Sequence, residues 1–130
     1  LLEQHRPELV IIELGGNDFL RKKNASSVKE NLRNIIQQSQ AAGSQVVLVA
    51  VPHLSILRAG IGALSDSDIY GELADETGVV LVPDVFAEVL SDDALRADAV
   101  HPNARGYQQF TAGIINVLRS EGLLQSVIAQ

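Results

Sequence analysis

The fold of this chain is decided by the stretch Leu9-Val10-Ile11-Ile12-Glu13-Leu14-Gly15-Gly16-Asn17-Asp18. Its first six residues are mostly apolar and rich in β-branched side chains, which predicts a β-strand over 9–14. Because apolar residues occupy consecutive positions, we expect this strand to be buried on both faces, as in a parallel sheet. The two glycines end the strand and begin a turn whose backbone can approach a ligand closely.

The rest of the sequence repeats this alternation of strand and helix. Strands are predicted where short apolar runs end in glycine or proline, over 9–14, 46–51 and 79–82. Helices are predicted where apolar residues recur at helical spacing, over 27–43, 67–78, 85–90 and 104–121. Ser27 with Glu30 is predicted to cap the first of these helices, and Asn103 the last. The alternation predicts an α/β protein with a parallel sheet, right-handed crossovers and helices on the faces of the sheet.

Length and composition limit the class of protein. The 130 residues suit a single α/β domain over 1–130, and the low aromatic content of 4% implies a core of Leu, Ile, Val and Ala. A net charge of −6, with no basic run longer than Arg21-Lys22-Lys23, argues against a nucleic-acid partner. No apolar run approaches the roughly 18 residues of a membrane span. Without cysteine, the chain has no thiol nucleophile and no disulfide.

The start of the sequence suggests a segment of a longer protein. The chain contains no methionine, and its first residues resemble the end of a helix that leads into a strand. An apolar strand over 9–14 at the edge of a sheet would also promote aggregation unless another strand covered it. We therefore expect preceding polypeptide to supply a partner strand. Removal of an initiator methionine from a short reading frame is the alternative.

Asp98 and His101 stand three residues apart on a predicted loop before the last helix. A carboxylate that holds one ring nitrogen of an imidazole leaves the other free to move protons, which is the base half of a hydrolytic triad. The alternative is a solvated turn in which Asp98 caps a helix. Pro102 and Asn103 favour an ordered loop, because they fix an extended segment and a helix start directly after His101.

Asn17 follows the first predicted strand and is a second candidate site residue. Its side-chain amide, together with backbone N–H groups of the glycine turn, can donate hydrogen bonds to an oxyanion. The alternative is an ordinary turn, and Asp18 is interpreted as a turn former or helix cap. Because ligand sites in open parallel sheets lie beyond the carboxyl ends of the strands, Asn17 and His101 are expected to meet at one rim.

The strand with Gly15-Gly16-Asn17-Asp18, followed much later by Asp98-Ala99-Val100-His101-Pro102-Asn103, resembles the SGNH (GDSL) hydrolase family. The similarity extends over essentially the whole chain and is greatest to the acyl-CoA thioesterase I/lysophospholipase/arylesterase branch. The resemblance implies a three-layer α/β/α flavodoxin-like fold and hydrolysis of esters or thioesters without metal or organic cofactor. It implies that Asn17, with Gly16 nearby, belongs to the oxyanion hole, that His101 is the general base and acid, and that Asp98 orients His101.

The nucleophile of that family has no match in this sequence. Its serine stands in a Gly-Asp-Ser motif after the first strand, and a glycine of its second block is missing too. The serines present fit caps or loops. The resemblance therefore implies the C-terminal part of an SGNH hydrolase domain, whose missing N-terminal segment carries the serine of a Ser-His-Asp triad. The intact protein is expected to be an esterase, lipase or thioesterase, exported or periplasmic, and this segment alone nearly inactive.

Other interpretations remain open from the sequence. The protein can instead be a catalytically inactive SGNH-like module that binds a ligand or partner, which the absence of an upstream Gly-Asp-Ser would favour. A metal site from His53, Asp98 and His101 lacks the spacing typical of metal ligands. In the region 53–65, Leu54, Ile56 and Leu57 are candidates for a wall that binds an acyl chain, unless this loop packs on its own core.

Overall fold

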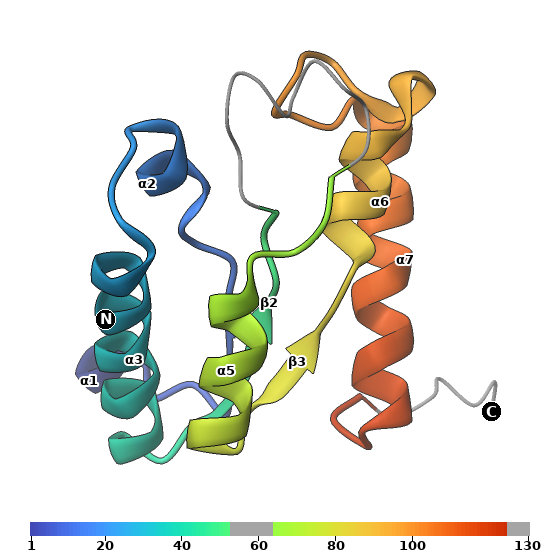
Figure 1. Cartoon of the computed structure of the whole chain (residues 1–130). Helices are drawn as coiled ribbons and strands as arrows, with labels where there is room; N and C mark the ends of the chain where they lie inside the picture. Colours follow the sequence, from blue (N-terminus) through green and yellow to red (C-terminus); the bar gives the residue numbers. More distant parts are fainter. Residues whose placement is uncertain (53–63, 125–130) are drawn as a thin grey trace, which may run out of the picture.

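The computed structural model describes residues 1–52 and 64–124 and contains a sheet of three parallel strands in the order β1-β2-β3 (Figure 1). These are β1 (Leu9–Ile12), β2 (Gln45–Val49) and β3 (Val80–Val82). The parallel sheet predicted from the sequence is confirmed, with each strand somewhat shorter than its apolar run.

The middle strand β2 forms the centre of the hydrophobic core. Its Val47 is aligned with Ile11 of β1 and with Val80 of β3. Every residue from Val46 to Val49 is buried. This burial on both faces is what a continuous apolar run in a parallel sheet predicts, and removal of these side chains from water stabilises the fold.

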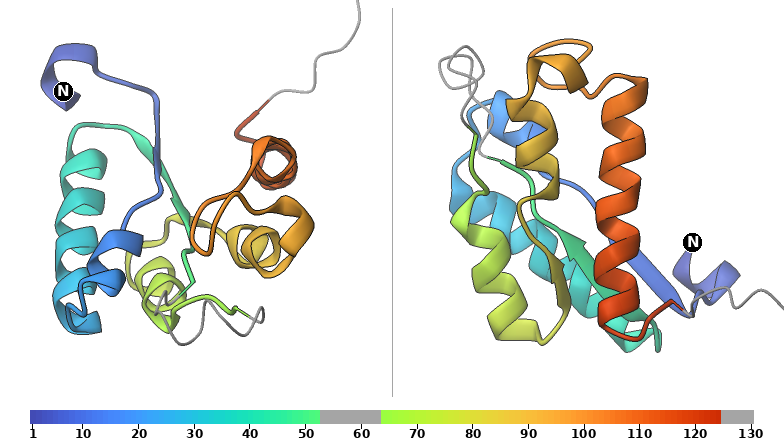
Figure 2. Two further views of the ribbon diagram at one scale, coloured as in Figure 1. Left: turned by 90° about the horizontal axis from the view of Figure 1, so that it is seen from above. Right: turned by 90° about the vertical axis from the view of Figure 1, so that its right-hand side faces the viewer.

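Helices cover both faces of the sheet (Figures 1 and 2). The crossovers from β1 to β2 and from β2 to β3 are α3 (Ala25–Ala41) and α5 (Asp68–Thr77). Right-handed crossovers that step in the same direction along a sheet put their helices on the same face, and α3 packs beside α5. The other face carries α6 (Val85–Ser91) and α7 (Ala104–Ser120), which pack against each other. The arrangement is the three-layer α/β/α fold.

Three short elements complete the described chain: α1 (Leu2–His5), α2 (Gly16–Leu20) and the 3-10 helix η1 (Asp93–Leu95). The sequence predicted only a turn where α2 forms. Here the backbone N–H of Phe19 donates to the carbonyl oxygen of Gly15 at 3.1 Å, and Phe19 is buried in the core.

The strand β1 is less buried than predicted. It ends at Ile12 instead of residue 14, and the side chain of Ile11 is 45% exposed while Ile12 is buried. Successive side chains of a strand point to opposite faces, and among the described residues β1 has a strand neighbour on one side only. The expectation of burial on both faces is therefore wrong for β1 in the described chain.

The helix caps agree with prediction at one helix and differ at the other. The cap predicted for α7 is confirmed, because Asn103 Oδ1 accepts a hydrogen bond from the backbone N–H of Gly106 at 2.9 Å. The capping box predicted for α3 is wrong. Asn24 is the cap, its Oδ1 accepting from the N–H of Ser27 at 2.8 Å, and Glu30 instead pairs with Arg33. Asparagine and serine cap helices about equally well, so spacing alone did not choose between them.

Candidate active site

Asp98 and His101 form a close side-chain pair on the loop that precedes α7. The Nδ1 atom of His101 lies 2.9 Å from both carboxylate oxygens of Asp98. Asp98 Oδ1 also accepts a hydrogen bond from the backbone N–H of Val100 at 2.9 Å. This N–H and, second, the hydrogen bond from His101 hold the pKa of Asp98 below its ordinary value.

The contact with Asp98 fixes the tautomer of His101. An ionised carboxylate only accepts hydrogen bonds, so the proton between the two residues belongs to Nδ1 of the imidazole. In the neutral ring, Nε2 is then the unprotonated nitrogen and can accept a proton. The pair can therefore act as a general base with its orienting partner.

The loop that carries this pair is held by backbone hydrogen bonds and by Asn103. The backbone N–H of Ala97 donates to the carbonyl oxygen of His101 at 2.9 Å. The Asn103 side chain caps α7 and also donates from Nδ2 to the carbonyl oxygen of Ala94 at 2.9 Å. These contacts order the loop, although the side chains of Asp98 and His101 are 58% and 63% exposed.

Asn17 lies in the first turn of α2, just beyond the carboxyl end of β1. The chain reaches it through Gly15, whose φ of 116° is a backbone conformation that side chains strongly disfavour. Asn17 is exposed, and within residues 1–52 and 64–124 its side-chain amide has no hydrogen-bond partner. Asp18 is in the first turn of α2 and forms an ion pair with Lys23 at 3.5 Å.

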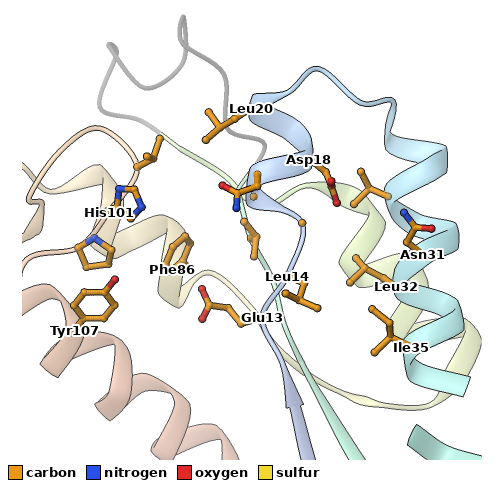
Figure 3. Close-up of a pocket in the computed structure, with 17 residues that line it drawn as sticks. Glu13, Leu14, Asp18, Leu20, Asn31, Leu32, Ile35, Phe86, His101 and Tyr107 are labelled. Atoms are coloured by element: carbon orange, nitrogen blue, oxygen red, sulfur yellow. The ribbon is translucent and has the colours of Figure 1, made fainter. Parts of the chain in front are cut away.

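One cavity of about 480 Å³ is lined by both Asn17 and His101. Figure 3 shows His101 and Tyr107 along one wall, and Leu32 and Ile35 of α3 along the opposite wall. Gly16 lines the same cavity. The structure thus brings together the residues at the two ends of the sequence that were expected to share a rim.

The cavity also contains two residues that the sequence analysis missed. Glu13 lies between the two walls (Figure 3). Although much of Glu13 is exposed, the cavity walls remove water from its carboxyl group, and this desolvation raises its pKa. Tyr107 of α7 is 50% exposed at the cavity. Its position one helical turn after the cap residue Asn103, close to His101 in sequence, was the signal that would have placed it there.

Several sequence predictions fall on residues that the structure does not describe. His53 and the proposed acyl-chain wall of Leu54, Ile56 and Leu57 lie outside the described residues. Within residues 1–52 and 64–124, no group of three or more acidic or histidine side chains is arranged to hold a metal ion. None of the helices in those two ranges combines the length and apolar character needed to cross a membrane.

Comparison with known proteins identifies the family. Residues 1–109 match the model of the GDSL-like lipase/acylhydrolase family. The chain belongs to this family. The predicted resemblance to SGNH (GDSL) hydrolases is confirmed, as is the fold class that it implied.

Bacterial family members are similar in sequence over most of the chain. It is 38% identical to thioesterase 1/protease 1/lysophospholipase L1 of Escherichia coli K12 over 116 residues, which cover 86% of this chain and 53% of that protein. It is 34% identical to esterase TesA of Pseudomonas aeruginosa over 107 residues, or 78% of this chain and 51% of that protein. The chain thus spans about half the length of the curated relatives that it matches.

Solved structures of esterases share the fold. The crystal structure of a TesA superposes with a TM-score of 0.78 at 27% sequence identity, covering 95% of this chain and 67% of that one. The psychrotrophic esterase EstA from Pseudoalteromonas gives a TM-score of 0.75 at 22% identity, covering 92% and 66%. At that identity the second likeness concerns the fold alone.

Proposed function

We propose that this chain supplies the base, its carboxylate partner and one oxyanion donor of a serine ester/thioester hydrolase. The nucleophilic serine lies in polypeptide upstream of residue 1. One observation carries the proposal: Asn17 and His101 line the same cavity, and Asp98 binds Nδ1 of His101 so that Nε2 is left as the base.

In this mechanism His101 Nε2 takes the proton of the serine hydroxyl while the serine oxygen attacks the carbonyl carbon of the substrate. The side-chain amide of Asn17 donates a hydrogen bond to the resulting oxyanion. His101 then gives its proton to the departing alcohol or thiol, which leaves an acyl-enzyme. Water repeats the sequence and releases the acid. Asp98 stays ionised throughout and stabilises the imidazolium, in agreement with its lowered pKa.

Three observations support a serine outside this chain. The cavity-lining residues include no serine among those that the structure describes. The curated relatives are about twice as long as the matched region. Among the described strands β1 lies at the edge of the sheet, so its outer edge can accept a further strand. Loss of a triad serine costs on the order of a millionfold in turnover, so residues 1–130 alone are expected to be nearly inert.

The proposed substrates are small carboxylic esters and thioesters. A neutral oxyanion donor and a histidine base suit either leaving group, because His101 can protonate an alkoxide or a thiolate as it departs. The E. coli relative is named a thioesterase and lysophospholipase, which supports this class of substrate.

A fluorophosphonate probe tests the proposal in the intact protein. We expect one covalent adduct, located by peptide mass spectrometry on a serine in a Gly-Asp-Ser sequence before residue 1. His101→Ala should suppress the adduct, because the serine loses its base. An adduct within residues 1–130 would contradict the proposal. No adduct and no ester hydrolysis would favour the inactive binding module.

A further inference from the structure

We propose that Tyr70 is a positioning residue that holds Asn17 in its place at the cavity. Tyr70 does not line the cavity and is not expected to touch the substrate. Its hydroxyl instead fixes the backbone turn between β1 and α2. The kinetic consequences rest on the function proposed above, whereas the contact itself can be tested without any activity.

Tyr70 makes a buried hydrogen bond to the backbone before Asn17. Tyr70 is completely buried on α5, and its hydroxyl donates to the carbonyl oxygen of Leu14 at 2.6 Å, across 56 positions of sequence. β1 ends at Ile12, so the carbonyl of Leu14 lies beyond the sheet ladder. A buried phenol needs a partner, and here that partner is the backbone three residues before Asn17.

The Tyr70 hydroxyl also packs closely on Gly15. A Cβ atom built on Gly15 would lie 2.3 Å from the Tyr70 oxygen and 3.3 Å from Cγ1 of Val28. The hydroxyl therefore occupies the space that a side chain at position 15 would need. Tyr70 and Gly15 form a complementary pair that fixes the Leu14–Gly15 peptide.

The helix α2, which carries Asn17, has little stability of its own. It has only five residues, and isolated helices of this length are unstable in water. Its first turn is tied to the fixed peptide, since the N–H of Phe19 donates to the carbonyl oxygen of Gly15 at 3.1 Å. Because the amide of Asn17 has no partner among the described residues, the backbone sets its position.

The environment keeps Tyr70 protonated and therefore a donor. Burial, and then the negative charges of Asp18, Asp66 and Glu13, raise the pKa of Tyr70. In the folded protein, the phenol therefore stays protonated and able to donate to Leu14 at neutral and mildly alkaline pH.

Kinetics of the intact protein test the link to Asn17. Tyr70→Phe removes the hydroxyl and keeps the ring. We expect kcat for an activated ester to fall about tenfold while KM changes by less than about twofold. This fall in kcat is smaller than the fall caused by loss of a whole oxyanion donor. In an Asn17→Ala background the same change should alter kcat by less than about twofold, since nothing is left to position. Thr77→Val removes another α5 hydroxyl, which donates to Leu73, and should leave kcat unchanged. Equal Tyr70→Phe effects in both backgrounds would overturn the link.

Two measurements without substrate test the contact. Gly15→Ala should lower the urea midpoint of unfolding more in the wild-type background than in the Tyr70→Phe background, because only Tyr70 carries the clashing oxygen. The strain of the positive φ is the same in both backgrounds, so equal falls in the urea midpoint would overturn the contact.

In NMR spectra, the signal of the Asn17 side-chain amide should shift or broaden in Tyr70→Phe and not in Thr77→Val. An unchanged signal in Tyr70→Phe would overturn the positioning role. If wild-type protein hydrolyses no ester, the proposed function fails, and these two results still decide whether Tyr70 holds Asn17.

Discussion

His101, with its partner Asp98, is held at the cavity by a short segment of chain, whereas Asn17, which lines the same cavity, depends on distant residues. The hydrogen bonds described for the His101 loop join residues between Ala94 and Gly106. The turn that leads to Asn17 is bound by Tyr70, 56 positions away.

This difference separates two ways of building a site. The Asp98–His101 pair forms wherever its loop and the start of α7 form, because its partners are close neighbours in sequence. If Tyr70 positions Asn17 as proposed, the turn before Asn17 takes its place only when α5 has packed against the sheet and Tyr70 has reached Leu14. Substitutions in the two regions should therefore differ in both size and kind of effect.

The largest expected effect is on the His101 wall. His101→Ala removes the base, and turnover of an activated ester by the intact protein should fall on the order of a millionfold. The fold should persist because His101 is exposed, which the urea midpoint of unfolding checks. His5→Ala, on α1 and outside the cavity, is the matched control and should retain full activity. Retained turnover in His101→Ala would remove this residue from the mechanism.

The next effect is the loss of the partner that orients His101. Asp98→Asn should reduce kcat about ten-thousandfold, because the amide no longer fixes the Nδ1–H tautomer. Asp92→Asn is a close control, since Asp92 Oδ1 accepts from the N–H two residues on, as Asp98 does, but has no imidazole beside it. Similar kinetics for both variants would mean that Asp98 only shapes its turn.

A smaller effect is expected at Asn17. Asn17→Ala should lower kcat about 100- to 1000-fold with little change in KM, because the hydrogen bond strengthens only as the oxyanion forms. Asn34→Ala removes the same amide from α3 at a place that does not line the cavity, and should leave kcat unchanged. A rise in KM with unchanged kcat would instead assign Asn17 to substrate binding.

The smallest effects concern the pH dependence of stability, and they have opposite signs for the carboxyl groups of Asp98 and Glu13. The pKa of Asp98 is lowered from 3.8, so its stabilising contribution is present above that pH and is lost as the pH falls through the folded pKa. The pKa of Glu13 is raised from 4.5, so its charge opposes folding above the folded pKa.

Urea midpoints across pH 3–7 measure this contrast. Glu13→Gln should be more stable than wild type near pH 7, and the difference should vanish below about pH 4.5. Asp98→Asn should be less stable than wild type near pH 7, with a difference that shrinks below pH 3.8. Parallel curves for the two variants would contradict the opposite pKa shifts.

The sequence by itself determined the order of the strands and of helices α3, α5, α6 and α7, the parallel sheet, the cap at Asn103 and the proximity of Asp98 to His101. These features depend on side-chain periodicity and on hydrogen bonds between near neighbours. Only the tertiary structure decided that Ile11 is exposed, that Glu13 is desolvated, that Tyr107 faces the cavity, and that Tyr70 packs on Gly15. Each of these four features depends on which distant parts of the chain come into contact. A local sequence pattern does not specify those contacts, because the same residue can be buried or exposed until its tertiary neighbours are in place.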